Sequence, residues 1–206
     1  VFEMGPYELA RLWYVDKDNT SGVEDGTSWA TAYRDVQRAI DAAAEALGGE
    51  VWVAEGVYAE ARSSLPLYHT EDTGSVVLKG GVDVYGGFTG TETDRAQRDP
   101  DLHPTVLDGS AALGGQPALH VVVGQSGVTL DGFTVTGGHA RGSGDAARGG
   151  GLWCVNASLQ VSHCLLRDNI ADARGGGAYC ARYAPRFEHT TFRNNNALEG
   201  GAVYLY

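Results

Sequence analysis

Hydrophobic and polar residues alternate in short runs through most of the chain. Leu159 and Val161 flank a glutamine, and Leu130, Phe133 and Val135 surround an Asp-Gly pair. A spacing of two residues is typical of half-buried β-strands, whereas amphipathic helices repeat every 3.6 residues. Glycine, asparagine and aspartate separate the runs, and these residues favour tight turns. We therefore predict short strands that are joined by tight corners.

The runs recur at a fixed spacing, which indicates a repeat architecture. Residues 148–169 and 174–195 align without a gap at an offset of 26, and residues 199–206 begin a third copy. Residues 128–138 fit the same pattern at an offset of 31, with the surplus in an insert at 139–148. The equivalent positions are Gly150 and Gly176, Trp153 and Tyr179, Cys154 and Cys180, Val161 and Phe187, His163 and His189, Leu166 and Phe192, Arg167 and Arg193, and Asn169 and Asn195.

Looser matches extend the pattern toward the N-terminus. The Leu-Asp-Gly within residues 105–109 matches the Leu-Asp-Gly within 129–133 at an offset of 23, and residues 84–88 lie a further 22 back. Such units are too short for a pair of helices, so each is interpreted as one coil of two or three short parallel strands. Inward residues of one coil then stack on those of the next. The predicted stacks are Val128 with Leu159, then Leu130, Val161 and Phe187, and then Val135, Leu166 and Phe192.

Asparagine marks one corner of the coil. Asn169 and Asn195 occupy the same phase, where asparagine tolerates a left-handed backbone and can bond to its equivalent in the next coil. The repeat, the strand period and these corners together predict an all-β fold, a right-handed parallel β-helix.

The N-terminal part is predicted to close one end of the stack. Residues 28–47 carry apolar side chains at steps of three and four, which predicts an amphipathic helix with Thr27 or Ser28 as its N-cap and Gly48-Gly49 as its stop. A first strand is predicted at 50–58. We expect a single domain over 1–206, in which 1–58 hold the leader, capping helix and first strand and 59–206 form coils that are open at the C-terminal end.

The last residues end in the middle of a unit. Either the sequence belongs to a larger parent chain, which we prefer, or the bare end is a face for self-association. The candidate assembly face is Val203, Tyr204, Leu205 and Tyr206. The apolar leader 1–15 is either a strand that pairs with a neighbour's open edge or a first strand packed on the cap of its own chain.

The composition of the chain limits the classes of partner that it is expected to bind. The net charge of −11 makes nucleic acid an unfavourable partner, because the phosphate backbone repels such a surface. We interpret the acidity as a solvated surface and expect no cofactor, although acidic side chains also suit Ca²⁺. The three cysteines form no CxxC pair, and we interpret Cys154 and Cys180 as stacked buried thiols. No signal peptide or transmembrane run is visible.

Several segments resemble a known family. Residues 13–43, 51–58 and 84–109 resemble the N-terminal module of large secreted bacterial right-handed β-helix proteins of the pectate-lyase-like superfamily. FRNN at 192–195 and GGAV at 200–203 resemble the paired motifs of polymorphic outer-membrane protein repeats, which occur in adhesins. The resemblance implies this fold, export, and a place outside the cell or on its surface. It implies no activity, because the fold hosts enzymes, adhesins and passive stalks.

The motifs of β-helix polysaccharide enzymes are poorly matched. Weak catalytic candidates gather around the insert at 139–148, namely His139, Asp168, Asp172 and Arg174. Carboxylates beside arginines could serve acid–base chemistry or bind an acidic sugar, but a solvated corner with stacked charges is the interpretation we prefer. His163 and His189 are interpreted as a corner ladder, and Asp108-Gly109 and Asp131-Gly132 as turns before calcium ligands.

We therefore expect an extracellular or cell-surface scaffold with a structural or adhesive role. Its expected partner is a carbohydrate or another ligand on a host or cell surface. Two alternatives stay open: a self-assembling extracellular fibre subunit that stacks end to end, and a polysaccharide lyase or hydrolase of the same fold.

Overall fold

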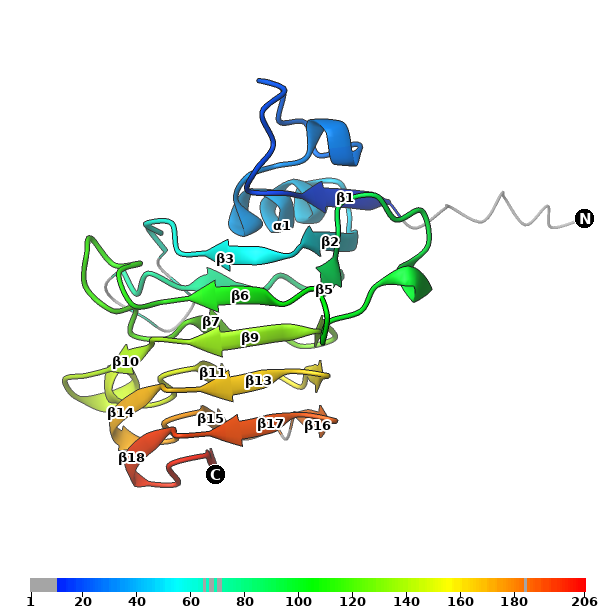
Figure 1. Ribbon diagram of the computed structural model, residues 1–206. Coiled ribbons are helices and arrows are strands. Elements are labelled where there is room, and N and C mark those ends of the chain that lie inside the picture. Colours follow the sequence, from blue (N-terminus) through cyan, green and yellow to red (C-terminus); the bar gives the residue numbers. More distant parts are fainter. Residues whose placement is uncertain (1–10, 65, 67–68, 70–71, 184) are drawn as a thin grey trace, which may run out of the picture.

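Stacked parallel strands build most of the protein. The computed structural model describes residues 11–64, 66, 69, 72–183 and 185–206. In this part of the chain the strands form four sheets, and every pairing between named strands is parallel. Figure 1 shows the strands β3, β6, β9, β13 and β17 stacked one above another.

The strands of each sheet come from successive coils. The first sheet has the order β1-β2-β5-β8-β12-β16, with β1 at Leu12–Val15, β2 at Gly49–Ala54, β5 at Val82–Phe88, β8 at Thr129–Asp131, β12 at Gln160–Ser162 and β16 at Arg186–Glu188. The second sheet contains β3 at Gly56–Tyr58, β6 at Thr105–Asp108, β9 at Phe133–Thr136, β13 at Leu165–Arg167 and β17 at Thr191–Arg193.

Two further sheets complete the coils. The third sheet contains β10 at His139–Ala140, β14 at Ile170–Arg174 and β18 at Asn196–Glu199. The fourth contains β4 at Val76–Val77, β7 at Val122–Val123, β11 at Leu152–Val155, β15 at Ala178–Ala181 and β19 at Val203–Leu205. From β8 to β12 the chain visits all four sheets and returns to the first. This path is that of a parallel β-solenoid-like fold.

Two of the three predicted interior stacks are confirmed by the strand register, and Val128 and Leu159 of the third are both buried in the same core. Val161 pairs with Leu130 on one side and Phe187 on the other. Leu166 lies in the same way between Val135 and Phe192. Burial of these side chains in one continuous apolar core is the main force that holds the coils together.

The looser matches toward the N-terminus are wrong. Leu107 pairs with Val135 rather than with Leu130, so β6 belongs to the second sheet, and Leu130 pairs with Val84. Leu-Asp-Gly occurs at two different corners of the coil, and this coincidence produced the apparent offset of 23. The true spacing is hidden by the segment 89–104, which lengthens its coil between β5 and β6.

The capping helix is shorter than predicted. Helix α1 spans Val36–Glu45, and its N-cap is Asp35, whose side chain accepts a hydrogen bond from the backbone N–H of Arg38. Residues Trp29–Thr31 form the separate 3₁₀ helix η1, and Ala32 is extended, so the helical path is broken there. Thr27 and Ser28 are therefore not the N-cap of α1. The apolar residues of the two segments serve different clusters, because Trp29 packs with Trp52 and Phe88 outside the first sheet, whereas the apolar residues of α1 join the main core.

Helix α1 covers one end of the core, as predicted. Val36, Ala39, Ile40 and Ala43 are wholly buried and belong to the main apolar cluster. The helix ends at Glu45, and the residues Leu47, Gly48 and Gly49 that follow it have positive φ, close to the predicted Gly48-Gly49 stop. In Figure 1, α1 lies beside β1 and β2, at the opposite end of the stack from β17 and β18.

The first strand of the first sheet is β1, not residues 50–58. β1 pairs in parallel with β2 of the same chain, from Leu12 opposite Glu50 to Val15 opposite Val53. Residues 50–58 form two strands in different sheets, because Gly56 has a φ of 137° and turns the chain between them. Residues 12–15 of the leader therefore belong to the sheet of their own chain, and residues 1–10 lie outside the described residues.

The predicted hydrogen bonding of the asparagine corner is confirmed, but the prediction that the asparagines themselves adopt a left-handed backbone is wrong. Asn169 Nδ2 donates to the Val135 carbonyl at 3.0 Å and to Asn195 Oδ1 at 3.1 Å. The positive φ falls on the preceding residues, Asp168 and Asn194. Because these exposed residues make the turn, each asparagine points inward and bonds the peptide groups of the corner.

Two smaller predictions concern the cysteines and the membrane. Cys154 and Cys180 face each other on β11 and β15 as free buried thiols, as predicted, and Cys164 is also free and buried. Among the described residues, no helix has the length and apolar character needed to cross a bilayer.

Candidate functional site

The segment 89–104 forms a wall on the outside of the first sheet. It contains the short 3₁₀ helix η2 at Arg95–Gln97, which Asp94 and Gln97 close with a capping box. Trp29 Nε1 donates to the Glu92 carbonyl at 2.9 Å. Burial alone would raise the pKa of the Glu92 carboxyl, but hydrogen bonds from the Thr89 and Thr91 backbone outweigh it and lower that pKa. We call this segment the wall segment.

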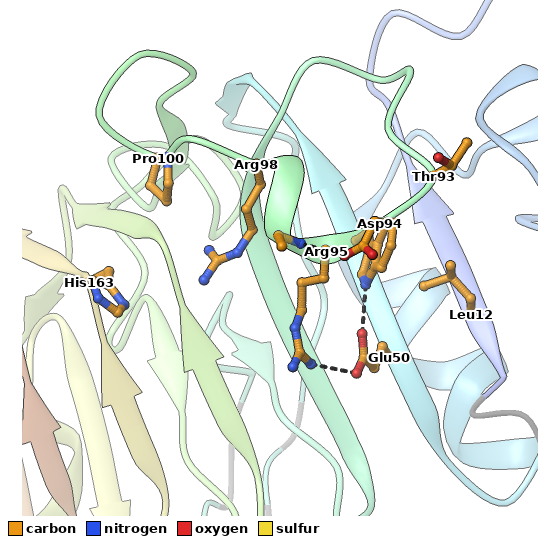
Figure 2. A pocket seen from close by; sticks show the side chains of 10 residues that line it. Leu12, Glu50, Thr93, Asp94, Arg95, Arg98, Pro100 and His163 are labelled. Carbon is orange, nitrogen blue, oxygen red and sulfur yellow. Dashed lines mark hydrogen bonds and ion pairs between the residues drawn. The ribbon is translucent and has the colours of Figure 1, made fainter.

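Two arginines fasten the wall segment to the sheet. Arg95 Nη1 lies 2.5 Å from Glu50 Oε1, and Arg98 Nη2 lies 2.5 Å from Asp131 Oδ1. Both guanidinium groups also lie over the ring of Tyr85, at 4.4 and 5.5 Å from its centroid. The spacing of three residues on a 3₁₀ turn places both side chains on one side, which directs them together at the sheet. Figure 2 shows the two arginines and the contact of Arg95 with Glu50.

A groove of about 710 Å³ runs between the wall segment and the first sheet. Its lining combines charged, aromatic, small polar and apolar side chains: Leu12, Glu50, Trp52, Thr93, Asp94, Arg95, Ala96, Arg98, Pro100 and His163 (Figure 2). The Trp52 Nε1 atom donates to Glu50 Oε2 at 2.8 Å, so Glu50 joins the indole to Arg95. These mutual bonds fix the shape of the groove before any ligand arrives.

A second hollow of about 610 Å³ continues on the other side of the wall segment. It lies over the second sheet and shares Pro100 and His163 with the first. The full lining is Pro100, Asp101, Pro104, Thr105, Gly132, Phe133, Thr134, His163, Cys164, Leu165, His189, Thr191 and Arg193. The two hollows therefore meet at His163 and follow the solenoid across two sheets.

His163 and His189 form the predicted corner ladder. Their rings are stacked, with centroids 5.1 Å apart and an angle of 14° between the planes. Both residues have positive φ, so both side chains leave their corners in the same direction. His163 Nδ1 also lies 3.2 Å from Asp131 Oδ2. Asp131 thus contacts His163 through one oxygen and Arg98 through the other.

Sequence reasoning missed Glu50, Arg95 and Arg98 as members of a site. The sequence predicts Asp131 as a turn residue because Gly132 follows it, and Gly132 does have positive φ. The contact between Asp131 and Arg98 joins residues that lie 33 positions apart. The only usable signal in the sequence was the pair of arginines inside a segment that interrupts the repeat.

The weak catalytic candidates around the insert at 139–148 are only partly brought together. His139 Nε2 lies 3.1 Å from Asp172 Oδ1, and this hydrogen bond lowers the pKa of the Asp172 carboxyl. Asp168 pairs with Arg167 at 2.6 Å, and that bond lowers its pKa as well. Within the described chain, no hydrogen bond or ion pair joins Asp168 or Arg174 to the pair of His139 and Asp172.

Arg174 takes part in a different arrangement. Its Nε atom lies 2.9 Å from Glu199 Oε2, and its guanidinium lies over the ring of Tyr204. Tyr204 stacks on Tyr179, with centroids 5.7 Å apart. The proposed assembly face is therefore mixed: Val203 and Tyr204 are half-buried, and Leu205 and Tyr206 are exposed.

Among the described residues, no group of three or more His, Cys, Asp or Glu side chains is placed to hold a metal ion. Both candidate turns use their carboxylates internally. Asp131 binds Arg98 and His163, and Asp108 accepts a hydrogen bond from the Ser110 backbone.

Comparison of the chain with protein-family models, curated proteins and solved structures found no match in any of the three.

Proposed function

We propose that the protein is an extracellular or cell-surface scaffold of the right-handed parallel β-helix type, with a structural and adhesive role. The sequence resemblance to secreted β-helix proteins and to polymorphic outer-membrane protein repeats supports export and surface display. The stacked parallel coils are compatible with that fold. A rod of stacked coils suits display because each coil contacts only its neighbours and the outer faces stay available for ligands.

The observation that carries the adhesive role is the groove beside the wall segment. Its ion pairs, Arg95 with Glu50 and Arg98 with Asp131, are made before a ligand arrives. Binding therefore does not require the wall segment to be ordered first, which removes part of the entropic cost. Guanidinium, carboxylate and hydroxyl groups along the groove can exchange hydrogen bonds with the hydroxyl groups of a carbohydrate, the ligand class we propose.

Binding to a panel of immobilised oligosaccharides, neutral and acidic, tests the adhesive role. We expect at least one glycan to bind and the variant Arg95→Gln to weaken that binding about 10-fold or more, because a charge-assisted contact is lost from the groove. Arg182→Gln is the matched control, since Arg182 bonds Asn156 at a different corner of the coil. Glycan binding that both variants leave unchanged would place the ligand elsewhere, and no binding to any glycan would contradict the proposal.

A polysaccharide lyase or hydrolase is the second candidate, and one contact favours it. His163 lies in the groove and its Nδ1 contacts Asp131, so its Nε2 is the ring nitrogen that is left to accept a proton from a substrate. Incubation with pectate, alginate or chondroitin, with and without calcium, tests this candidate. Unsaturated products or new reducing ends that disappear in His163→Ala would support an enzyme at this site. Products that disappear instead in Asp168→Ala or Arg174→Ala would place the enzyme's site at the insert.

A further inference from the structure

The second hollow, over β9, β13 and β17, differs in charge from the rest of the molecule. The whole chain carries a net charge of −11. The ionisable side chains that line this hollow are Asp101, His163, His189 and Arg193, apart from the buried thiol of Cys164. Asp131 lies behind His163, but its negative charge is compensated by Arg98 at 2.5 Å. The hollow therefore carries no excess of negative charge on a strongly acidic protein.

Arg193 is the principal cation of the hollow. It lies on β17 opposite Arg167 of β13, one coil away. Arg167 is paired with Asp168, and the charge of Arg193 also helps to lower the pKa of that carboxyl. Among the described side chains, however, none forms a hydrogen bond or ion pair with the guanidinium of Arg193. A guanidinium presents a planar fork of donors that matches two oxygens of an anion. Arg193 is thus a cation with its donors available at the edge of the hollow.

Imidazole and hydroxyl donors lie along the same hollow. His163 and His189 stack at one border, where β12 and β16 have just ended. Thr134 and Thr191 both pair with Leu165, on its two sides, so they share one outward column between the histidines and Arg193. An anion in this hollow would have imidazole, hydroxyl and guanidinium donors along its lining. Such a set suits an anion with several oxygens arranged around one atom.

We propose that this second hollow binds the tetrahedral oxyanion of a sulfate or phosphate ester carried by a saccharide. This inference rests on the proposed carbohydrate-binding function and names the chemical group that gives it specificity. Asp101 stands on the opposite border, on the wall segment, and its carboxylate opposes anions. The arrangement therefore favours a ligand whose anionic group lies toward Arg193 and whose sugar lies toward the wall segment.

Titration with inorganic sulfate and phosphate, at ionic strength held constant with chloride, tests the site directly. We expect backbone amide signals of β13 and β17 to shift with sulfate and phosphate but not with chloride. Arg193→Gln should weaken the binding about 10-fold or more, and Asp101→Asn should strengthen it. Arg182→Gln is the matched control, because Arg182 bonds Asn156 at a different corner of the coil, does not line the hollow and should leave the affinity unchanged.

A second titration compares the two ester sources and separates this inference from the general function. Neutral dextran, dextran sulfate and a phosphorylated dextran are the three probes. Preference for one charged dextran that is lost in Arg193→Gln identifies the source. Equal binding of all three would contradict the oxyanion site and leave the carbohydrate-binding proposal standing. Sulfate or phosphate binding without binding of any dextran or glycan would support the anion site and contradict the carbohydrate-binding proposal. No difference from chloride, or equal loss in Arg182→Gln and Arg193→Gln, would overturn the site.

Discussion

The carboxylate of Asp131 lies 2.5 Å from the guanidinium of Arg98, and this ion pair joins the wall segment to the corner of the next coil. Both side chains are largely buried, at 14% exposure for Arg98 and 10% for Asp131. The other Asp131 oxygen contacts His163. One carboxylate thus links the wall segment, the first sheet and the histidine ladder, and the geometry of both hollows depends on it.

Removal of this carboxylate should destabilise the protein. We expect Asp131→Ala to lower the free energy of unfolding by about 3 kcal/mol, because the buried guanidinium of Arg98 is left without its partner. Urea denaturation measures the loss. The control is Asp145→Ala, which removes the partner of Arg148 from a more exposed pair and should cost less than about 1 kcal/mol. Equal losses of unfolding free energy in the two variants would contradict the prediction that the Asp131–Arg98 ion pair stabilises the fold more than an exposed pair does.

The central aliphatic stack should be sensitive to cavity formation. Leu166 is 1% exposed and lies between Val135 and Phe192. We expect Leu166→Ala to cost about 2–5 kcal/mol of unfolding free energy, since it removes buried methyl groups and leaves a cavity. Leu198→Ala, at a leucine that is 86% exposed, should change stability by less than about 0.5 kcal/mol. Denaturation midpoints that shift by the same amount would show that the stack is not the core.

The asparagine ladder should not tolerate an apolar residue of similar size. Asn169 is wholly buried, and its Oδ1 atom accepts a hydrogen bond from the Gly138 backbone at 3.0 Å while Nδ2 donates to Val135. We expect Asn169→Leu to cost about 2–4 kcal/mol, because the Gly138 amide and the Val135 carbonyl lose buried partners. Asn196→Leu, at an exposed asparagine in β18, is the control. Thermal unfolding of both variants at one pH provides the comparison, and a tolerant Asn169 would contradict the ladder.

Acid should destabilise the fold through His120. This histidine is fully buried, and burial lowers its pKa to about 3, although Nδ1 lies 2.9 Å from the Gly149 carbonyl. The unfolded chain binds a proton at the ordinary histidine pKa of about 6.5, so stability is present above that pH and is lost as the pH falls toward 3. The maximum slope is about 1.4 kcal/mol per pH unit.

A variant isolates this contribution from the carboxylates that titrate in the same range. Between pH 6.5 and 4.5 the unfolding free energy of the wild type should fall more steeply than that of His120→Gln, which cannot take up the proton. Urea denaturation at a series of pH values gives both slopes. Parallel slopes would show that His120 does not control the acid sensitivity.

Self-association through the candidate assembly face is tested by sedimentation. If copies stack end to end through Val203, Tyr204, Leu205 and Tyr206, the sedimentation coefficient should rise with concentration and electron micrographs should show rods. Leu205→Glu should abolish the rods, because Leu205 is 61% exposed on β19 and a charge would enter the contact. Val57→Glu is the control at an exposed apolar residue of β3. A monomer at all concentrations would contradict the fibre alternative.

The sequence by itself determined the parallel coils, the stacks Leu130–Val161–Phe187 and Val135–Leu166–Phe192, and the histidine ladder. It could do so because a repeat places equivalent side chains one above another, and the offset in sequence is then the register in space. Even the partner of Asn169 followed from the offset, although the residue with positive φ did not.

Only the tertiary structure decided where the groove lies. The wall segment interrupts the repeat, so no offset relates Arg95 to Glu50 or Arg98 to Asp131. Contacts between a non-repeating segment and the face of a sheet depend on how that segment folds back, and the period of the strands carries no information about it. The repeat therefore specifies the solenoid, and the segment that breaks the repeat shapes the candidate site on its surface.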